Sequence, residues 1–259
     1  MTRIITVANQ KGGVGKTTTA VNLGASLAAA EKSTLVVDLD PQGNATSGLG
    51  VDPQGLELGT YEVLIGIRGA KEAIVPSALD FLDVLPAGRD LAGAEVELVD
   101  AVHRERHLKN AIEPIRGEYD FIIVDCPPSL GLLTLNALCA ADAVVVPLQC
   151  EYYALEGLSR LLDTIQIIRQ EINPNLEIDG ILLTMFDKRT SLSDQVAKEV
   201  RENFDGRVFE TIIPRNVRLS ESPSFGKPAL LYDAKSIGSQ SYLEFAKEYL
   251  ETDVGRQIE

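Results

Sequence analysis

The chain has 259 residues, 45% hydrophobic and 24% charged, which is enough apolar material for one α/β domain or two small ones. Its 38 acidic and 24 basic residues give a formal charge of −14, which excludes a uniformly basic nucleic-acid binder but not a locally basic face. No run approaches the roughly 18 apolar residues of a membrane span, no signal-peptide pattern opens the sequence, and three cysteines cannot all pair, so we expect a reduced, cytoplasmic protein.

Apolar, β-rich runs alternate with helical stretches along the chain. Strands are predicted at Ile4–Ala8, Thr34–Asp38, Phe81–Leu85, Phe121–Asp125, Ala143–Leu148, Ile178–Thr184 and Phe209–Ile213. Helices are predicted at Lys16–Ala30, Leu130–Ala140, Leu155–Ile172, Ser193–Asn203 and Ile237–Leu250. Because nearly continuous apolar strands are buried on both faces, the pattern predicts one doubly wound α/β domain over residues 1–259, a mostly parallel sheet with helices on both faces. The glycine-punctuated stretch Gly48–Gly69 is expected to be a mobile surface excursion.

A glycine-rich loop, QKGGVGKTT at residues 10–18, joins the first predicted strand to the first predicted helix. Its glycines let backbone N–H groups approach a phosphate, and the helix N-terminus adds partial positive charge. Lys16 would reach the β- and γ-phosphates of a nucleotide, and the Thr17 hydroxyl would coordinate Mg²⁺. A tight connecting turn is the alternative, which the strand–loop–helix context disfavours. The loop departs from the general P-loop pattern at Gln10, where glycine is usual, and a second lysine, Lys11, stands beside it.

Carboxylates end two of the predicted strands. Asp125 closes the apolar run at 121–125, and an acid at that place beside the phosphate loop can hold Mg²⁺, as a Walker B strand does. A helix N-cap is the alternative role for Asp125. Asp38 and Asp40 lie at the end of another strand, and their spacing of two residues places both side chains on the same side of it. A carboxylate at this position can orient an attacking water. Two carboxylates in a turn are otherwise commonly just solvated.

The motif KGGVGKTT resembles the deviant Walker A motif of the ParA/MinD class of P-loop ATPases. Further segments extend the resemblance over almost the whole chain and toward the short chromosomal Soj type of the ParA branch: VDLDPQGNAT at 37–46, IVDCPPS at 123–129, EYYALEG at 151–157 and IPRNVRLSE at 213–221. The resemblance implies a Mg²⁺-dependent ATPase for chromosome or plasmid partition. It further implies an ATP-dependent homodimer, non-specific binding to double-stranded DNA, a ParB/Spo0J-type centromere-binding partner, and a cytoplasmic, nucleoid-associated location without membrane binding.

The family match assigns roles to individual residues near the phosphates. It makes Asp40 the catalytic aspartate, and it places Asp38 near the metal with Thr17 and Asp125. It makes Lys11 a signature lysine that reaches the partner's nucleotide in trans, as an arginine finger does, so that hydrolysis depends on dimerisation. The implied catalytic residues are Lys11, Lys16 and Asp40.

At the base of the nucleotide, the match implies that Pro214 packs on adenine and that Asn216 hydrogen-bonds it. A turn-forming proline and a capping asparagine are the alternative. The implied nucleotide-binding residues are Lys11, Gly12, Gly13, Val14, Gly15, Lys16, Thr17, Thr18, Pro214 and Asn216.

Basic charge gathers in one segment. Residues 186–235 contain nine Lys/Arg and eight Asp/Glu, net +1, whereas the other 209 residues hold 15 and 30, net −15. ParA-like proteins bind DNA through this region, and Arg189 and Arg218 match the family's DNA-contacting arginines most closely. Scattered surface lysines are the alternative. The basic candidates are Lys188, Arg189, Lys198, Arg201, Arg215, Arg218, Lys227 and Lys235, of which Arg189, Arg218, Lys198, Lys227 and Lys235 are the predicted DNA contacts.

Two other functions share this fold. A MinD-like membrane-cycling ATPase would end in a basic amphipathic helix, but residues 250–259 are acidic and short. The apolar stripe upstream is expected to pack on the body of the protein; it comprises Tyr242, Leu243, Phe245, Ala246, Tyr249 and Leu250. A metabolic ATP-dependent synthetase would need a substrate pocket, and an iron-protein reductase would need paired cysteines, that the sequence does not indicate.

The two histidines of the chain lie close together in the sequence. His103 and His107 are spaced i, i+4 on an expected helix, but no third ligand is close in sequence, which disfavours a metal site. Cys126 is expected to be a small buried hydrophobe. Because the loop begins near residue 11, we expect no additional N-terminal DNA-binding domain and no sequence-specific operator binding.

Overall fold

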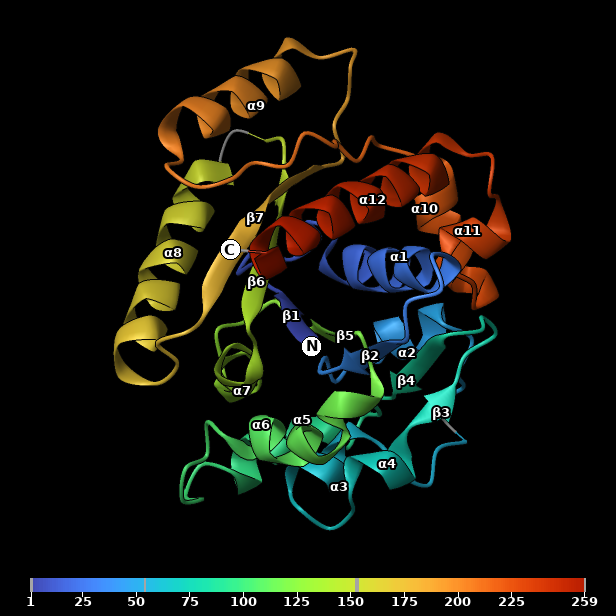
Figure 1. Ribbon diagram of the computed structural model, residues 1–259, viewed down its shortest axis with the longest axis vertical. Helices are drawn as coiled ribbons and strands as arrows, with labels where there is room; N and C mark the ends of the chain where they lie inside the picture. Colours follow the sequence, from blue (N-terminus) through green and yellow to red (C-terminus); the bar gives the residue numbers. More distant parts are fainter. Residues whose placement is uncertain (1, 54, 152–153, 259) are drawn as a thin grey trace.

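A single sheet sets the frame of the molecule (Figure 1). The computed structural model describes residues 2–53, 55–151 and 154–258, so Tyr152 and Tyr153 of the motif at 151–157 lie outside the described residues. Within these ranges, seven strands pair in the order β3-β4-β2-β5-β1-β6-β7, and β3 alone runs antiparallel to its neighbour. The strands are β1 (Arg3–Val7), β2 (Thr34–Asp38), β3 (Val75–Pro76), β4 (Leu82–Leu85), β5 (Phe121–Asp125), β6 (Ala143–Gln149) and β7 (Glu177–Thr184). The predicted mostly parallel sheet is confirmed.

Helices cover both faces of the sheet. They are α1 (Lys16–Ala29), α2 (Asn44–Gly48), α3 (Thr60–Leu64), α4 (Ala70–Ala73), α5 (Leu91–Glu97), α6 (His107–Ile112), α7 (Leu132–Ala140), α8 (Ala154–Glu171), α9 (Ser191–Asn203), α10 (Val217–Glu221), α11 (Ala229–Tyr232) and α12 (Ile237–Ile258), with short 3₁₀ turns at Glu113–Glu118 and Ser222–Phe225. One core lies under α1, α2, α10, α11 and α12, where α12 lies alongside α1 (Figure 1). The other core lies under α3 to α9. Neighbouring strand residues alternate between them, so Ile4 packs into one core and Ile5 into the other.

The strand predicted at Phe209–Ile213 is wrong. The segment runs beside β7 but makes only isolated bridges, between Ile181 and Val208 and between Phe186 and Pro214. Its central amides are diverted, because the backbone N–H groups at 210 and 211 donate to the carboxylate of Glu248 on α12 at 2.9 Å each. The Glu248 carboxylate thus accepts the hydrogen bonds that the backbone carbonyls of a neighbouring strand would accept in a regular ladder.

The expectation of a mobile excursion at Gly48–Gly69 is also wrong for its second half. Here α3 packs into the core, with Thr60 0%, Val63 2% and Leu64 1% exposed. The helix begins at Gly59, whose N–H donates to Oε2 of Glu62 at 2.8 Å. Burial of this short helix fastens the segment to the sheet.

The two histidines do not share a helix. His103 lies in a turn with φ 53°, and α6 begins only at His107. A ring nitrogen of His107 lies 2.9 Å from the carbonyl oxygen of Leu64, so the ring joins α6 to α3. Cys126 is fully buried, as expected of a small hydrophobe.

The C-terminal helix lies on the body along its aromatic side. Tyr242, Phe245, Ala246 and Tyr249 are each 3% exposed or less, and Leu250 packs partly buried against the same core. The stripe predicted for this helix is packed as expected at these five residues, whereas Leu243 is only partly buried and is not part of the core. No helix among the described residues combines the length and apolarity needed to cross a membrane.

Candidate nucleotide-binding site

The predicted phosphate loop joins the end of β1 to the start of α1. Gly13 (φ 74°) and Gly15 (φ 92°) adopt left-handed backbone conformations that a side chain would strain. Nδ2 of Asn9 donates to a backbone carbonyl of β6 at 2.8 Å, and Oγ1 of Thr184 at the end of β7 donates to the carbonyl oxygen of Val14 at 2.8 Å. The loop is therefore fastened to two neighbouring strands, with its glycines toward solvent.

Lys16 opens α1 and carries its ammonium into the loop. The residue is 6% exposed, and Nζ donates to the carbonyl oxygen of Lys11 at 3.1 Å. Burial lowers the pKa of Lys16, while the charges of Asp125 and Asp40 act in the opposite direction. A cation enclosed in this way interacts strongly with an anion that enters the loop, because screening by water is weak there.

Asp125 ends β5 directly beside the loop. It is fully buried, and neither carboxylate oxygen has a hydrogen-bond partner with good geometry among the described residues. Burial and the charge of Asp38 raise the pKa of Asp125 well above its usual range, whereas Thr17 and Lys16 favour its charged form. A buried carboxylate without donors is costly unless a proton or a cation meets it. The carboxylate oxygens of Asp125 and the neighbouring hydroxyl of Thr17 are suitable ligands for a divalent cation of the Mg²⁺ type.

Asp38 stands opposite Asp125 in the register of β2 and β5. Unlike Asp125, it has donors on both oxygens: Oδ1 accepts from the N–H of Asp40 at 3.1 Å, and Oδ2 accepts from the N–H and the hydroxyl of Thr46 at 2.8 and 2.7 Å. Burial raises the pKa of Asp38 to about 6 despite these hydrogen bonds. Asp38 therefore fixes the loop between β2 and α2, next to the predicted metal position.

Asp40 lies in that loop and is 7% exposed. Its Oδ1 accepts from the N–H of Gln42 at 2.9 Å, which fixes the carboxylate on the loop. Its charge favours the charged form of Lys16, so the two groups lie close enough to interact electrostatically. A water between them and a bound phosphate would have a carboxylate acceptor, the arrangement that hydrolysis needs.

Lys11 is bound to a side chain outside the phosphate loop. Its ammonium forms an ion pair with Glu151, at 2.8 Å between Nζ and Oε2, and the two side chains are 37% and 46% exposed. Glu151 follows β6 and also accepts from Nε2 of Gln149 at 2.5 Å. The second lysine of the loop is thus partly exposed and is paired with Glu151 of its own chain.

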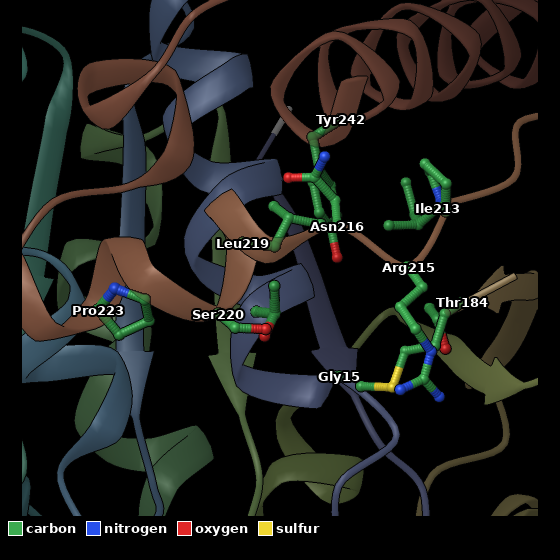
Figure 2. Close-up of a pocket in the computed structure, with 12 residues that line it drawn as sticks. Gly15, Thr184, Ile213, Arg215, Asn216, Leu219, Ser220, Pro223 and Tyr242 are labelled. Atoms are coloured by element: carbon green, nitrogen blue, oxygen red, sulfur yellow. The ribbon is translucent and has the colours of Figure 1, made fainter. Parts of the chain in front are cut away.

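A cavity of about 300 Å³ lies between the loop and the α10 region (Figure 2). Gly15 and Thr18 form its floor toward the loop, and Pro214 and Asn216 line it from the segment before α10. Oδ1 of Asn216 accepts from the N–H of Arg218 at 2.9 Å, so Asn216 also caps α10. The cavity thus brings Pro214 and Asn216, the two residues predicted to meet the nucleotide base, beside Gly15 and Thr18.

Several lining residues were not predicted to belong to the nucleotide site: Thr184, Met185, Ile213, Arg215, Leu219, Ser220, Pro223 and Tyr242. Thr184 has a usable signal, since it ends a predicted parallel strand at the edge where ligands bind. Tyr242 has no such signal, because it lies on α12, more than twenty residues after Asn216 in the sequence. The packing of α12 brings Tyr242 to the cavity, where its hydroxyl lies 3.1 Å from that of Thr19.

The structure gathers most of the predicted site. At the carboxyl ends of β1, β2 and β5 it brings together Lys11, Gly12, Gly13, Val14, Gly15, Lys16, Thr17, Thr18, Asp38, Asp40 and Asp125. Pro214 and Asn216 join them through the cavity.

The predicted DNA contacts are all exposed but are spread over several elements. Arg189 precedes α9 and is paired with Asp187, whereas Arg218 on α10 is paired with Glu221 and Asp233. The lysines are dispersed: Lys198 on α9 lies 3.7 Å from Glu202, Lys227 precedes α11, and Lys235 precedes α12.

A strand–loop–helix with an enclosed lysine, flanked by strand-end carboxylates, defines a P-loop nucleotide-binding protein. A family model described as an AAA domain matches residues 2–178. The chain is 59% identical over 251 residues to the chromosome partitioning protein ParA of Myxococcus xanthus, covering 97% of this chain and 89% of that protein. It is 56% identical over 248 residues to the sporulation initiation inhibitor protein Soj of Bacillus subtilis, covering 96% and 98%. The chain belongs to the ParA/Soj family of chromosome-partitioning ATPases.

A solved structure shares the fold closely. Cobyrinic acid a,c-diamide synthase from Mycobacterium smegmatis, with bound ADP and magnesium, matches with a TM-score of 0.85 at 43% identity, covering 95% of this chain and 93% of that chain. The identity is lower than that to the two partitioning proteins.

Proposed function

We propose that residues 1–259 form one ATPase domain that binds ATP with Mg²⁺, hydrolyses it to ADP and phosphate, and uses the cycle for DNA partition. The observation that carries the proposal is the buried Asp125 carboxylate, which lies near Lys16 and Thr17 and has no hydrogen-bond partner of good geometry among the described residues. Such a group is accounted for by a cation that accompanies a bound phosphate. Membership of the ParA/Soj family and the ADP and magnesium of the solved relative support the same ligands.

Each residue of the site then has a chemical task. Thr17 and Asp125, with Asp38 nearby, would hold Mg²⁺, which would supply positive charge to offset the charge of the nucleotide phosphates. Lys16 offsets the phosphate charge in the bound state. Asp40 accepts a hydrogen bond from the attacking water and orients it.

The partition cycle adds a second chain and DNA. ATP binding builds a sandwich dimer, in which Lys11 leaves Glu151 and meets the nucleotide of the other copy. The dimer doubles the basic face of residues 186–235 and binds DNA of any sequence through its phosphates, on the nucleoid. A ParB-type centromere-binding partner stimulates hydrolysis, which releases the DNA.

The M. smegmatis neighbour gives specific support to a second candidate, an ATP-dependent amide-forming synthetase. That activity would consume ATP only with a carboxylate substrate present. The partition proposal predicts the reverse, with ATP consumed without any organic substrate and faster with DNA and partner.

Sedimentation of the purified protein, without nucleotide, with ADP and with ATP, each with and without a duplex of random sequence, tests the proposal. We expect a dimer only with ATP and co-sedimentation with DNA only in that state. Phosphate release is measured in parallel. A chain that stays monomeric in ATP, or hydrolyses ATP only when a carboxylate substrate is added, would overturn the partition function.

A further inference from the structure

Arg189 and Arg218 are not free cations in this structure. The Arg189 guanidinium binds Asp187 through two parallel contacts, Nε to Oδ1 at 2.9 Å and Nη2 to Oδ2 at 2.7 Å. The Arg189 side chain is 84% exposed, so this pair stands in water rather than in a packed interior. Two parallel N–H···O contacts are also the way in which a guanidinium binds a phosphate. Asp187 therefore occupies the face of Arg189 that a phosphate would take.

Arg218 repeats the arrangement with two carboxylates. Its Nη1 lies 2.8 Å from Oε2 of Glu221, and its Nε lies 3.3 Å from Oδ2 of Asp233. The hydroxyl of Tyr232 lies 3.2 Å from the same oxygen of Glu221 and helps to hold that carboxylate. The guanidinium is thus engaged on two sides, although its side chain is 49% exposed.

The two arginines belong to one connected part of the surface. The N–H of Arg215 donates to the carbonyl oxygen of Phe186 at 3.0 Å, which ties the chain before α10 to the loop before α9. The charge of Arg215 also lowers the pKa of Asp187, after the larger effect of the Arg189 hydrogen bonds. A backbone bond therefore keeps the loop of Arg189 beside the helix of Arg218.

We propose that Asp187, Glu221 and Asp233 are guard carboxylates, which occupy the phosphate positions of Arg189 and Arg218 and compete with DNA for them. The inference rests on the proposed DNA binding and concerns its regulation. A bound duplex must displace each guard. The observed affinity of the two arginines for phosphate is therefore lower than their intrinsic affinity, by an amount that depends on the strength of the ion pair. Exposed pairs are weak, which keeps the competition mild and reversible. The guards thus hold the DNA affinity of one chain low, so that binding requires the doubled surface of the dimer.

The test measures the affinity of the ATP-bound protein for a labelled duplex of random sequence over a salt series. Asp187→Asn removes the guard charge but keeps an oxygen that can accept from the backbone N–H of Arg189, 3.0 Å from Oδ1. We expect binding about two- to fivefold tighter at each salt concentration, in line with the strength of exposed ion pairs. Glu221→Gln with Asp233→Asn should tighten binding similarly through Arg218.

The matched control is Asp205→Asn. Asp205 is exposed in the loop after α9 and forms no ion pair with any described residue, so its loss changes net charge by the same amount without freeing an arginine. A second control places Asp187→Asn in an Arg189→Gln background, where removing the guard should have no effect beyond that of Asp205→Asn. Thermal melting of each variant checks that the fold is retained.

The outcomes separate the two proposals. In one outcome, the wild type binds DNA while Asp187→Asn and the Glu221/Asp233 double variant bind it no more tightly than Asp205→Asn does. This result overturns the guard assignment alone. An undiminished gain in the Arg189→Gln background also overturns it, because no arginine is then being released. Failure of the wild type and every variant to bind DNA with ATP overturns the DNA-binding function itself.

Discussion

The ammonium of Lys11 lies 2.8 Å from Oε2 of Glu151, so the lysine that distinguishes this loop is bound to its own chain before any partner arrives. Both side chains are partly exposed, which makes the pair weak enough to exchange. A contact of Lys11 with a second chain would compete with its ion pair with Glu151. Nucleotide binding within one chain and contact between two chains can therefore be separated by substitution.

Lys11→Ala should bind ATP with modest loss and fail to form the ATP dimer. Glu151→Gln should do the opposite and favour the dimer by up to about fivefold, because it frees the ammonium from an exposed ion pair. Sedimentation velocity with ATP measures both. A Lys11→Ala chain that dimerises as the wild type does would show that Lys11 does not act in trans.

Asp40→Ala should keep ATP binding and ATP-dependent dimerisation while hydrolysis collapses, because the attacking water loses its acceptor. The contrasting variant is Lys16→Ala, which should lose nucleotide binding itself, since the enclosed ammonium offsets the phosphates in the ground state. Equilibrium binding of a fluorescent ATP analogue and single-turnover phosphate release distinguish the two. Wild-type turnover in Asp40→Ala would refute its role.

Arg189→Glu or Arg218→Glu should weaken binding to every duplex alike. Each phosphate contact contributes about 0.9 to the slope of log affinity against log salt, so a dimer should lose about two contacts for each substitution. Titration over a salt series with ATP and with ADP measures the slope. A slope that neither substitution changes, or equal binding in the two nucleotide states, contradicts the assignment of this face.

Glu248 should link stability to pH. Burial opposes its ionisation, but hydrogen bonds from Thr211, the N–H of Glu210 and Arg207 outweigh burial and lower its pKa below the ordinary 4.5. With a folded-state pKa below the unfolded one, its contribution is present above about pH 4.5 and is lost as pH falls through the folded value. Glu248→Gln should therefore cost about 1–3 kcal/mol at neutral pH and progressively less in acid.

Urea unfolding at about pH 7 and about pH 3.5 measures that difference. Glu244→Gln is the matched control, since Glu244 is exposed one turn earlier on α12. An equal loss from Glu248→Gln at both pH values would show that the ionised carboxylate is not what stabilises this contact.

The sequence predicts the phosphate loop and the strand-end acids because each depends on a few neighbouring residues. Gly13, Gly15 and Lys16 act through local backbone geometry, and Asp125 follows an apolar run whose burial is evident from its composition. Such features need no knowledge of distant contacts.

The features that were missed depend on long-range contacts. The segment at 209–213 has the composition of a strand, but two of its backbone N–H groups donate to the carboxylate of Glu248. No residue near the segment in the sequence indicates these hydrogen bonds. Tyr242 reaches the cavity beside Gly15 and Asn216 because α12 packs on α1. The pairing of Arg218 with Asp233 likewise joins residues whose meeting depends on the turn between α10 and α12.

One short stretch serves two ligands in the proposed cycle. Pro214 and Asn216 line the cavity, Asn216 caps α10, and Arg218 stands two residues further along. Gly238 packs so closely on this helix that a Cβ there would lie 2.6 Å from Cγ of Leu219. The proposed contacts with the base and with the duplex therefore lie on one short, closely packed stretch of chain. We expect a substitution within it to change nucleotide binding and DNA binding together.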